Sequence, residues 1–179
     1  MKQLMKLMIV TIVALSFAAP AFAANTKKID KRSEKALETF YAEVKGGEKL
    51  LTHAAGYLVF PKITKGGIGI GYEQGDGKLV VNGQTEGYYR TRAASVGFQL
   101  GGQTRSQMLV FMTEEALEQF VNASGWEVGV DGSVALVKLG AGGAVDTGTY
   151  DAPILAFVFS NKGLMYNLTI EGSKISKLD

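Results

Sequence analysis

The chain has 179 residues, a formal net charge of +2 and no cysteine. The lack of cysteine excludes disulfides, thiolate metal sites and cysteine nucleophiles, as well as a lipid-modified cysteine as a membrane tether. A chain of this length fits one domain that can bury a real hydrophobic core.

The first 23 residues have the pattern of a cleavable secretion signal. Lys2 and Lys6 precede an apolar run over residues 7–19, and Pro20 and a small-residue triplet follow it. The run is shorter than the roughly 20 residues of a membrane-spanning helix, although an uncleaved anchor is the alternative. We expect residues 1–23 to be removed, residues 24–179 to form a single domain, and the protein to be exported to the periplasm or cell envelope, where it could be peripheral on a membrane.

Loss of the signal changes the charge balance, because Lys2 and Lys6 leave with it. The 19 basic residues then fall to 17, which equals the number of acidic residues. A neutral mature chain gives no reason to expect a nucleic-acid partner. Electrostatic attraction must therefore come from local clusters of charge.

One such cluster opens the mature segment and contains Lys27, Lys28, Lys31, Arg32 and Lys35. It runs into apolar residues that recur at three- and four-residue steps from residue 29 to residue 44, a pattern that predicts an amphipathic helix. The adjacent glycines at 46 and 47 should interrupt this helix, and a second short helix over residues 48–54 should follow.

From residue 56 onward, short extended runs alternate with glycine-rich and polar segments, which predicts strands. Hairpin turns are expected at 74–77 and 161–163, so that neighbouring strands pair antiparallel. One helix interrupts them, with Thr113 as its N-cap and Gly125 at its end. The fold class is α+β: a strongly coiled antiparallel sheet or partial β-barrel with N-terminal helices and one inserted helix. The expected strands are 57–60, 67–72, 78–81, 86–91, 95–100, 107–112, 134–139, 154–159 and 164–170.

Glycine is the most informative residue type, since all 23 glycines lie in the mature segment. Between Gly67 and Gly71 they occupy alternate positions, which leaves one face of that strand without side chains. Tight sheet curvature or close packing is one interpretation, and a face lined by a ligand is the other. A nucleotide-binding loop is disfavoured, because the stretch lacks the G-K-[ST] ending.

The sequence holds no recognisable catalytic or metal-binding pattern. His53 is the only histidine, and neither an H-x-x-x-H spacing nor a G-x-S-x-G motif is present. Glu114 and Glu115 are explained by the first turn of a helix, where negative charge is favourable. We therefore expect a binding protein rather than an enzyme, with no metal and no cofactor.

Three groups of basic residues suit a membrane surface. Besides the cluster over 27–35, Lys62 and Lys65 follow the Phe60-Pro61 corner, and Arg90 and Arg92 lie beside two tyrosines. Clustered Lys and Arg attract anionic head groups by about 1 kcal/mol each, and aromatic residues suit the interface. The alternative is that the helix stripe packs on the sheet and its charges are simply solvated.

A series of motifs runs through the mature segment: AAGYLVFP at 54–61, KGG at 65–67, Gly69 and Gly71, SVGFQLGGQ at 95–103, the 109–111 strand with its 114–120 helix, and the pairs at 159–160, 163–164 and 171–172. Their order over residues 30–175 resembles the SYLF-domain family of lipid-binding proteins. The resemblance implies phospholipid binding, with basic and amphipathic N-terminal segments in contact with the membrane. Eukaryotic relatives are also linked to actin, a role that we do not transfer to a chain with a bacterial-looking secretion signal. The alternatives are a small integral outer-membrane β-barrel and a structural envelope protein-interaction module.

Overall fold

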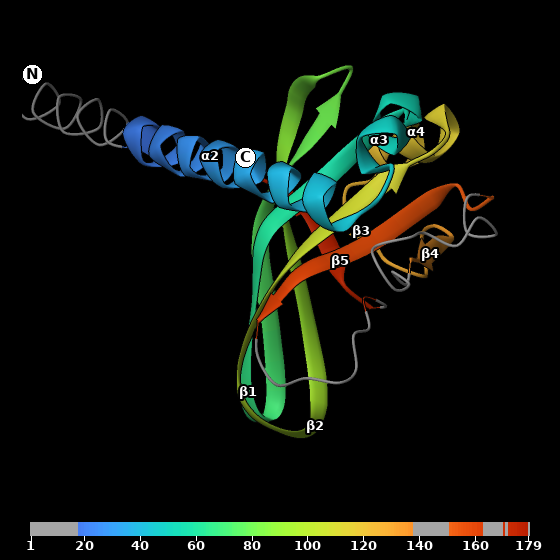
Figure 1. Ribbon diagram of the computed structural model, residues 1–179. Helices are drawn as coiled ribbons and strands as arrows, with labels where there is room; N and C mark the ends of the chain where they lie inside the picture. Colours follow the sequence, from blue (N-terminus) through green and yellow to red (C-terminus); the bar gives the residue numbers. More distant parts are fainter. Residues whose placement is uncertain (1–17, 138–150, 163–169, 171, 179) are drawn as a thin grey trace, which may run out of the picture.

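The computed structural model describes residues 18–137, 151–162, 170 and 172–178. Within these ranges three helices and six strands follow one another along the chain (Figure 1). The helices are α2 (Ala18–Glu43), α3 (Gly47–His53) and α4 (Glu114–Asn122), and the strands are β1 (Gly56–Val81), β2 (Gln84–Phe111), β3 (Trp126–Glu127), β4 (Val134–Leu136), β5 (Ile154–Lys162) and β6 (Lys174–Lys177).

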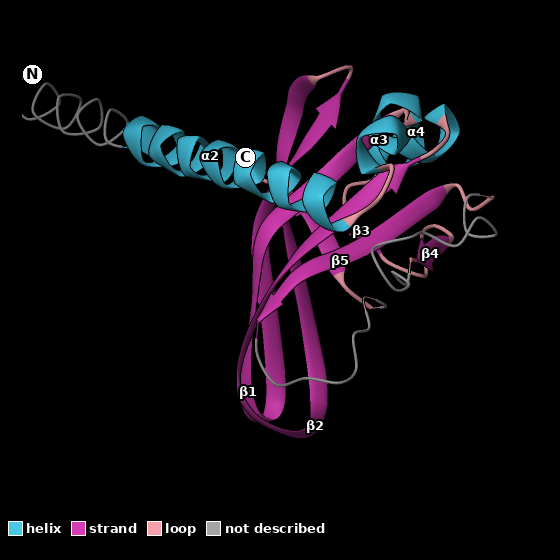
Figure 2. Ribbon diagram, viewed as in Figure 1, coloured by secondary structure: helices cyan, strands magenta, loops and turns pink. Residues whose placement is uncertain are grey.

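The six strands form one sheet in the order β3-β6-β2-β5-β4, with β1 paired to β2. Every pairing is antiparallel except that of β4 with β5, which is parallel. The sheet curls into a half-barrel (Figure 2), and α2 and α3 pack in one core against it whereas α4 packs in the other. The predicted α+β class with a strongly coiled sheet is confirmed, and the parallel pair is the one departure from the expected antiparallel pattern.

β1 and β2 are much longer than expected, because each joins three of the predicted strands. They form a hairpin around Asn82 and Gly83, whose φ angles of 51° and 76° suit a two-residue turn of the Asn-Gly type. The turn expected at 74–77 is wrong: these residues lie inside β1, opposite residues 89–92 of β2. Gly75 and Gly77 instead lie where another part of β1 approaches closely.

The long ribbon bends back on itself (Figure 1), and glycines permit the close contact between its two halves. Gly67 has a φ of 154°, and a Cβ there would lie 2.0 Å from the carbonyl oxygen of Ile70. A Cβ on Gly77 would lie 2.2 Å from the carbonyl oxygen of Val59. No larger residue fits at either position. The structure supports the interpretation of these glycines as sites of curvature and close packing.

Alternation along the ribbon divides the buried side chains between two cores. One core lies inside the bend, where Leu58 and Phe111 pack with Phe120 of α4. The other lies beneath α2, where Phe40 contacts the rings of Phe157 and Phe159 at centroid distances of 5.2 and 5.5 Å. The apolar stripe of α2 is therefore used in packing on the sheet.

The helix boundaries follow local signals. Thr113 is the N-cap of α4, since its hydroxyl accepts a hydrogen bond from the backbone N–H of Ala116 at 3.2 Å. The helix ends at Asn122, before the expected Gly125. Gly46, with a φ of 78°, separates α2 from α3 as predicted.

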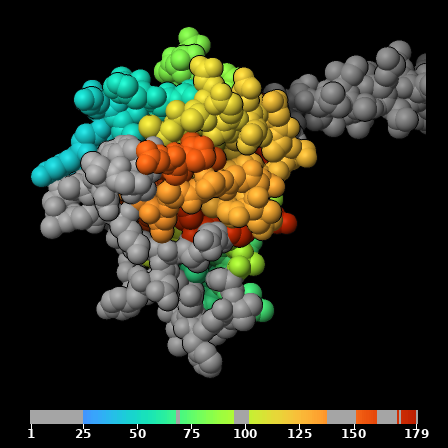
Figure 3. All heavy atoms as spheres, turned by 90° about the vertical axis from the view of Figure 1, so that its right-hand side faces the viewer, coloured from blue at the N-terminus to red at the C-terminus, as the bar shows by residue number. Residues whose placement is uncertain are grey.

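Elements from the second half of the chain gather at the end of the molecule that carries α3 and α4 (Figure 3). β3 and β6 were not predicted, because they are short and pair with distant strands. β4 begins where expected, at Val134, and ends at Leu136. The turn expected at 161–163 falls partly within β5, and most of the strand expected at 164–170 lies outside the described residues.

Candidate functional site

α2 lies across the β1–β2 ribbon, and Asp30 fixes one of its flanks there. The Asp30 carboxylate accepts hydrogen bonds from Lys78 Nζ at 3.2 Å and from the Tyr88 hydroxyl at 2.9 Å. Burial raises the pKa of Tyr88, and the hydrogen bond to Asp30 and its negative charge raise it further. These contacts hold the opposite flank of α2 over the Pro61-Lys62 corner of β1.

That opposite flank is basic. Lys28, Arg32 and Lys35 are spaced by four and three residues, so they lie on one side of the helix. They line two cavities of about 270 and 320 Å³ between α2 and the ribbon, which both contact Arg32, Pro61 and Lys62. We call the two adjoining cavities the α2 groove. Its lining is Asn25, Lys28, Ile29, Arg32, Lys35, Ala36, Thr39, Pro61, Lys62, Thr64, Gln74, Gly75, Asp76, Thr104, Arg105, Ser106 and Ser160.

A local irregularity of β1 presents Lys62 to the groove. The pairing register with β2 shifts between Phe60 and Ile63, so Pro61 and Lys62 bulge out of the ladder. Pro61 has no N–H to lose from the sheet, and its carbonyl accepts a hydrogen bond from the Ser106 hydroxyl at 2.9 Å. The bulge is thus anchored to β2, which places Lys62 opposite the basic flank of α2.

The groove is suited to an anion. Four of its cations, Lys28, Arg32, Lys35 and Lys62, are exposed, and none takes part in an ion pair within the part of the chain that the structure describes. Four hydroxyl residues line the larger cavity. Ser106 and Thr39 already donate to the carbonyl oxygens of Pro61 and Lys35, which leaves the hydroxyls of Thr104 and Ser160 to donate to an anion. Asp76 is the only carboxylate among the lining residues, and Arg90 neutralises it.

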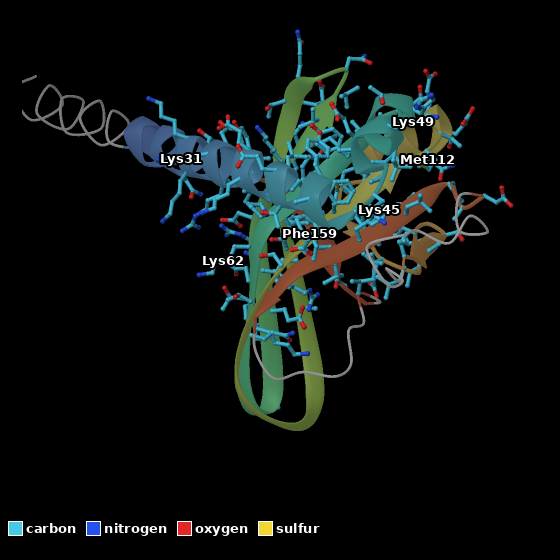
Figure 4. All side chains as sticks on the ribbon, viewed as in Figure 1. Lys31, Lys45, Lys49, Lys62, Met112 and Phe159 are labelled. Carbon is cyan, nitrogen blue, oxygen red and sulfur yellow. The ribbon has the colours of Figure 1, made fainter. Side chains whose placement is uncertain are left out.

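The remaining cations of the N-terminal cluster point elsewhere on the helix. Lys27 and Lys31 are exposed on the side of α2 that faces away from the sheet. Figure 4 shows Lys31 on α2 and Lys62 below it, on the side of the molecule away from Lys45 and Lys49. Five predicted cations of α2 and one of β1 therefore lie in one region.

The other three predicted site residues are placed differently. Lys65 is buried, and its Nζ lies 3.0 Å from Glu73 Oε1, while Arg105 lies 2.8 Å from Glu73 Oε2. Arg90 forms two hydrogen bonds with Asp76, of 2.5 and 2.9 Å, and this pairing raises the pKa of Arg90. Arg92 is exposed and lines a separate cavity. None of the three belongs to the α2 groove.

The described residues contain no group of three or more His, Asp or Glu side chains that could hold a metal ion. His53 Nδ1 lies 2.7 Å from the carbonyl oxygen of Lys49, at the end of α3, where the ring can donate a hydrogen bond to the helix. Within the same residues, no helix is both long and apolar enough to span a membrane.

Sequence reasoning found the cations of the groove but not their arrangement. The spacing of Lys28, Arg32 and Lys35 was a signal that would have separated them from Lys27 and Lys31 on the helix. No local signal indicates that Lys62 faces this flank, because that depends on the bulge in β1.

Comparison with known proteins addresses the second half of the chain. Residues 92–179 match a family model described as Ysc84, Las17-binding protein actin regulator. No curated protein matches the chain. The matched segment begins within β2 and contains β3 to β6, whereas α2 and β1 precede it. This is the family that the sequence motifs indicated, and residues 92–179 carry the SYLF-domain (Ysc84) match.

Proposed function

We propose that this protein binds anionic phospholipid head groups at a membrane surface through the α2 groove, and that it acts by binding rather than by catalysis. The observation that carries the proposal is the set of four cations from α2 and β1 that line one groove without ion-pair partners among the described residues. The SYLF-domain match is consistent with lipid binding.

The side chains of the groove suit a phosphate group in different ways. Arg32 can donate two parallel hydrogen bonds to phosphate oxygens, whereas the lysines act as point charges. Lys27 and Lys31 add attraction from the exposed side of α2. Since the apolar stripe of α2 from Ile29 to Phe40 is buried, the proposed contact is peripheral and electrostatic.

We also propose that the chain is exported and cleaved after Ala23. Cleavage would remove Ala18–Ala23 from α2 and leave its cationic part next to the new N-terminus. Mass spectrometry of the protein released by osmotic shock should give an N-terminus at Ala24. A chain that retains residues 1–23 and stays in the membrane pellet would contradict the proposal.

Sedimentation with vesicles tests the lipid contact. The mature protein should sediment with vesicles that contain phosphatidylglycerol, stay in the supernatant with vesicles of phosphatidylcholine alone, and be released as salt screens the charges. The Arg32→Gln, Lys62→Gln double variant should bind roughly thirtyfold more weakly, because two cations near an anionic surface contribute about 1 kcal/mol each.

A matched control removes the same charge from another place. Lys45 and Lys49 are exposed near α3, and the Lys45→Gln, Lys49→Gln variant should bind vesicles nearly as well as the unmodified chain. Equal losses in both double variants would mean that net charge, not the groove, controls binding. If the groove variant still captured an envelope protein while vesicle binding was lost, a separate protein-interaction role would be favoured.

A further inference from the structure

A cavity larger than either part of the α2 groove lies apart from it, at the junction of β1, β2, β3 and β6. Its volume is about 770 Å³, within the usual range for small-molecule sites. We call it the β6 cavity. It is lined by Tyr72, Arg92, Ala93, Ala94, Ser124, Gly125, Trp126, Glu127, Asp131, Gly172, Lys174, Ile175 and Ser176.

Two cations face each other across neighbouring strands at this cavity. Arg92 of β2 is the direct pairing partner of Lys174 of β6, and like charges in that position are unfavourable. Lys174 has a counter-ion on its other side, because Glu127 of β3 is its partner there and lies 3.5 Å away. Arg92 has no ion pair within the described residues.

The acidic residues of the cavity are already engaged. Glu127 forms an ion pair with Lys174. Asp131 Oδ2 accepts a hydrogen bond from the Glu127 backbone N–H at 2.6 Å. Arg92 is therefore the cation of the lining that no ion pair engages among the described residues, while Asp131 keeps its negative charge. A single anionic group beside Arg92 would relieve its repulsion with Lys174, and a guanidinium can bind a carboxylate or a phosphate with two hydrogen bonds.

Two large exposed side chains of β1 lie at and beyond the cavity. Tyr72 lines the cavity opposite Ala94, its pairing partner, and keeps 49% of its surface exposed. Ile70, two residues away on β1, is 69% exposed. Large apolar residues that stay exposed beside a polar cavity are typical of a binding surface.

We infer that the β6 cavity binds a single-chain anionic amphiphile, whose carboxylate or phosphate pairs with Arg92 and whose hydrocarbon chain lies along Tyr72 and Ile70. This site is distinct from the proposed membrane contact, and it would hold one lipid molecule rather than a lipid surface. Either a fatty acid or a lysophospholipid has the required chemistry.

Isothermal titration calorimetry with three probes tests the inference: laurate, lauroyl lysophosphatidic acid and uncharged monolaurin, each below its critical micelle concentration. At least one anionic probe should bind with one-to-one stoichiometry, and its preference over the other identifies the head group. Monolaurin should bind at least about tenfold more weakly, since it lacks the charge-assisted hydrogen bonds to Arg92. An absence of saturable binding by both anionic probes would overturn the inference.

Variants locate the site. Arg92→Gln should weaken binding of the anionic probe at least about tenfold, and Arg92→Lys should restore part of it, because the charge returns without the paired donors. The Lys45→Gln, Lys49→Gln variant should keep the probe affinity, because neither lysine lines the β6 cavity. If the Arg32→Gln, Lys62→Gln variant lost the probe while Arg92→Gln retained it, the amphiphile would lie in the α2 groove and the inference would be overturned. Vesicle sedimentation that persists without probe binding would overturn this inference alone.

Discussion

A buried cluster of charged side chains joins the two halves of the bent ribbon, and we expect its disruption to lower the free energy of unfolding. The Glu73 carboxylate forms ion pairs with Lys65 Nζ at 3.0 Å and with Arg105 Nη2 at 2.8 Å. Each of the three side chains is less than a tenth exposed. Lys65 and Glu73 come from opposite halves of β1, so their pair crosses the bend. The cluster should contribute to the stability of the fold rather than to ligand binding.

Glu73→Gln keeps the size of the side chain but leaves two buried cations without a counter-ion. Breaking a buried ion pair by removing one partner costs about 3–5 kcal/mol. Domains of this size are stable by only about 5–15 kcal/mol, so the variant should lose a large part of its free energy of unfolding. By contrast, Asp76→Asn breaks the Arg90 pair, whose side chains are about a quarter exposed. Its cost should be about 1 kcal/mol, because those charges remain partly hydrated.

Urea unfolding followed by circular dichroism measures both variants against the unmodified mature chain. The predicted order of midpoints is unmodified, then Asp76→Asn, then Glu73→Gln. If Glu73→Gln were as stable as Asp76→Asn or more stable, the assignment of Lys65, Glu73 and Arg105 to a structural cluster would be refuted.

Two other predictions concern packing and pH. Gly77→Ala should destabilise the fold by about 3 kcal/mol or more, because its Cβ would overlap the carbonyl oxygen of Val59, whereas Gly125→Ala, with no atom within 4 Å of the added Cβ, should change the urea midpoint little. Tyr88 should ionise above its ordinary pKa of 10.0, so the stability it contributes should be present below that pH and decline as pH rises through its pKa in the folded protein. Asp30→Asn should move the Tyr88 titration, followed by NMR of the tyrosine rings, back toward pH 10.0, and an unchanged titration would contradict the role of Asp30.

The helices and the class of the fold could be predicted because their signals are local. The apolar period of α2, the break at Gly46 and the N-cap Thr113 each depend on residues within a few positions. The strand boundaries could not be predicted in the same way. Glycines at 75 and 77 are compatible both with a turn and with a close approach of two backbones, and only the contact with residues 59–63 decides between them.

The position of the hairpin turn could have been predicted from a local signal. Asn82-Gly83 is the dipeptide most typical of a two-residue turn, and it lies between residues 78–81 and 84–88, which pair in β1 and β2. Placing the turn there would have paired the predicted strands at 78–81 and 86–91 as a hairpin. The bend of the β1–β2 ribbon would still have required knowledge of contacts distant in sequence.

The candidate site shows a similar division. The basic cluster over residues 27–35 was visible as a run of charge, and its position on α2 followed from the helical period. The partners of the other cations were not visible, since Glu73 lies eight residues from Lys65 and Asp76 lies fourteen from Arg90. A lysine in a basic cluster can be a surface charge or half of a buried pair, and only the fold distinguishes them.

NMR titration of the mature protein with a short-chain, water-soluble phosphatidylglycerol tests the central claim most directly. Backbone amide shifts should move in a saturable way at Lys28, Arg32, Lys35 and Lys62, and the changes should be lost in the Arg32→Gln, Lys62→Gln variant. Saturable shifts that leave these residues unchanged would contradict the claim that the α2 groove binds anionic phospholipid head groups.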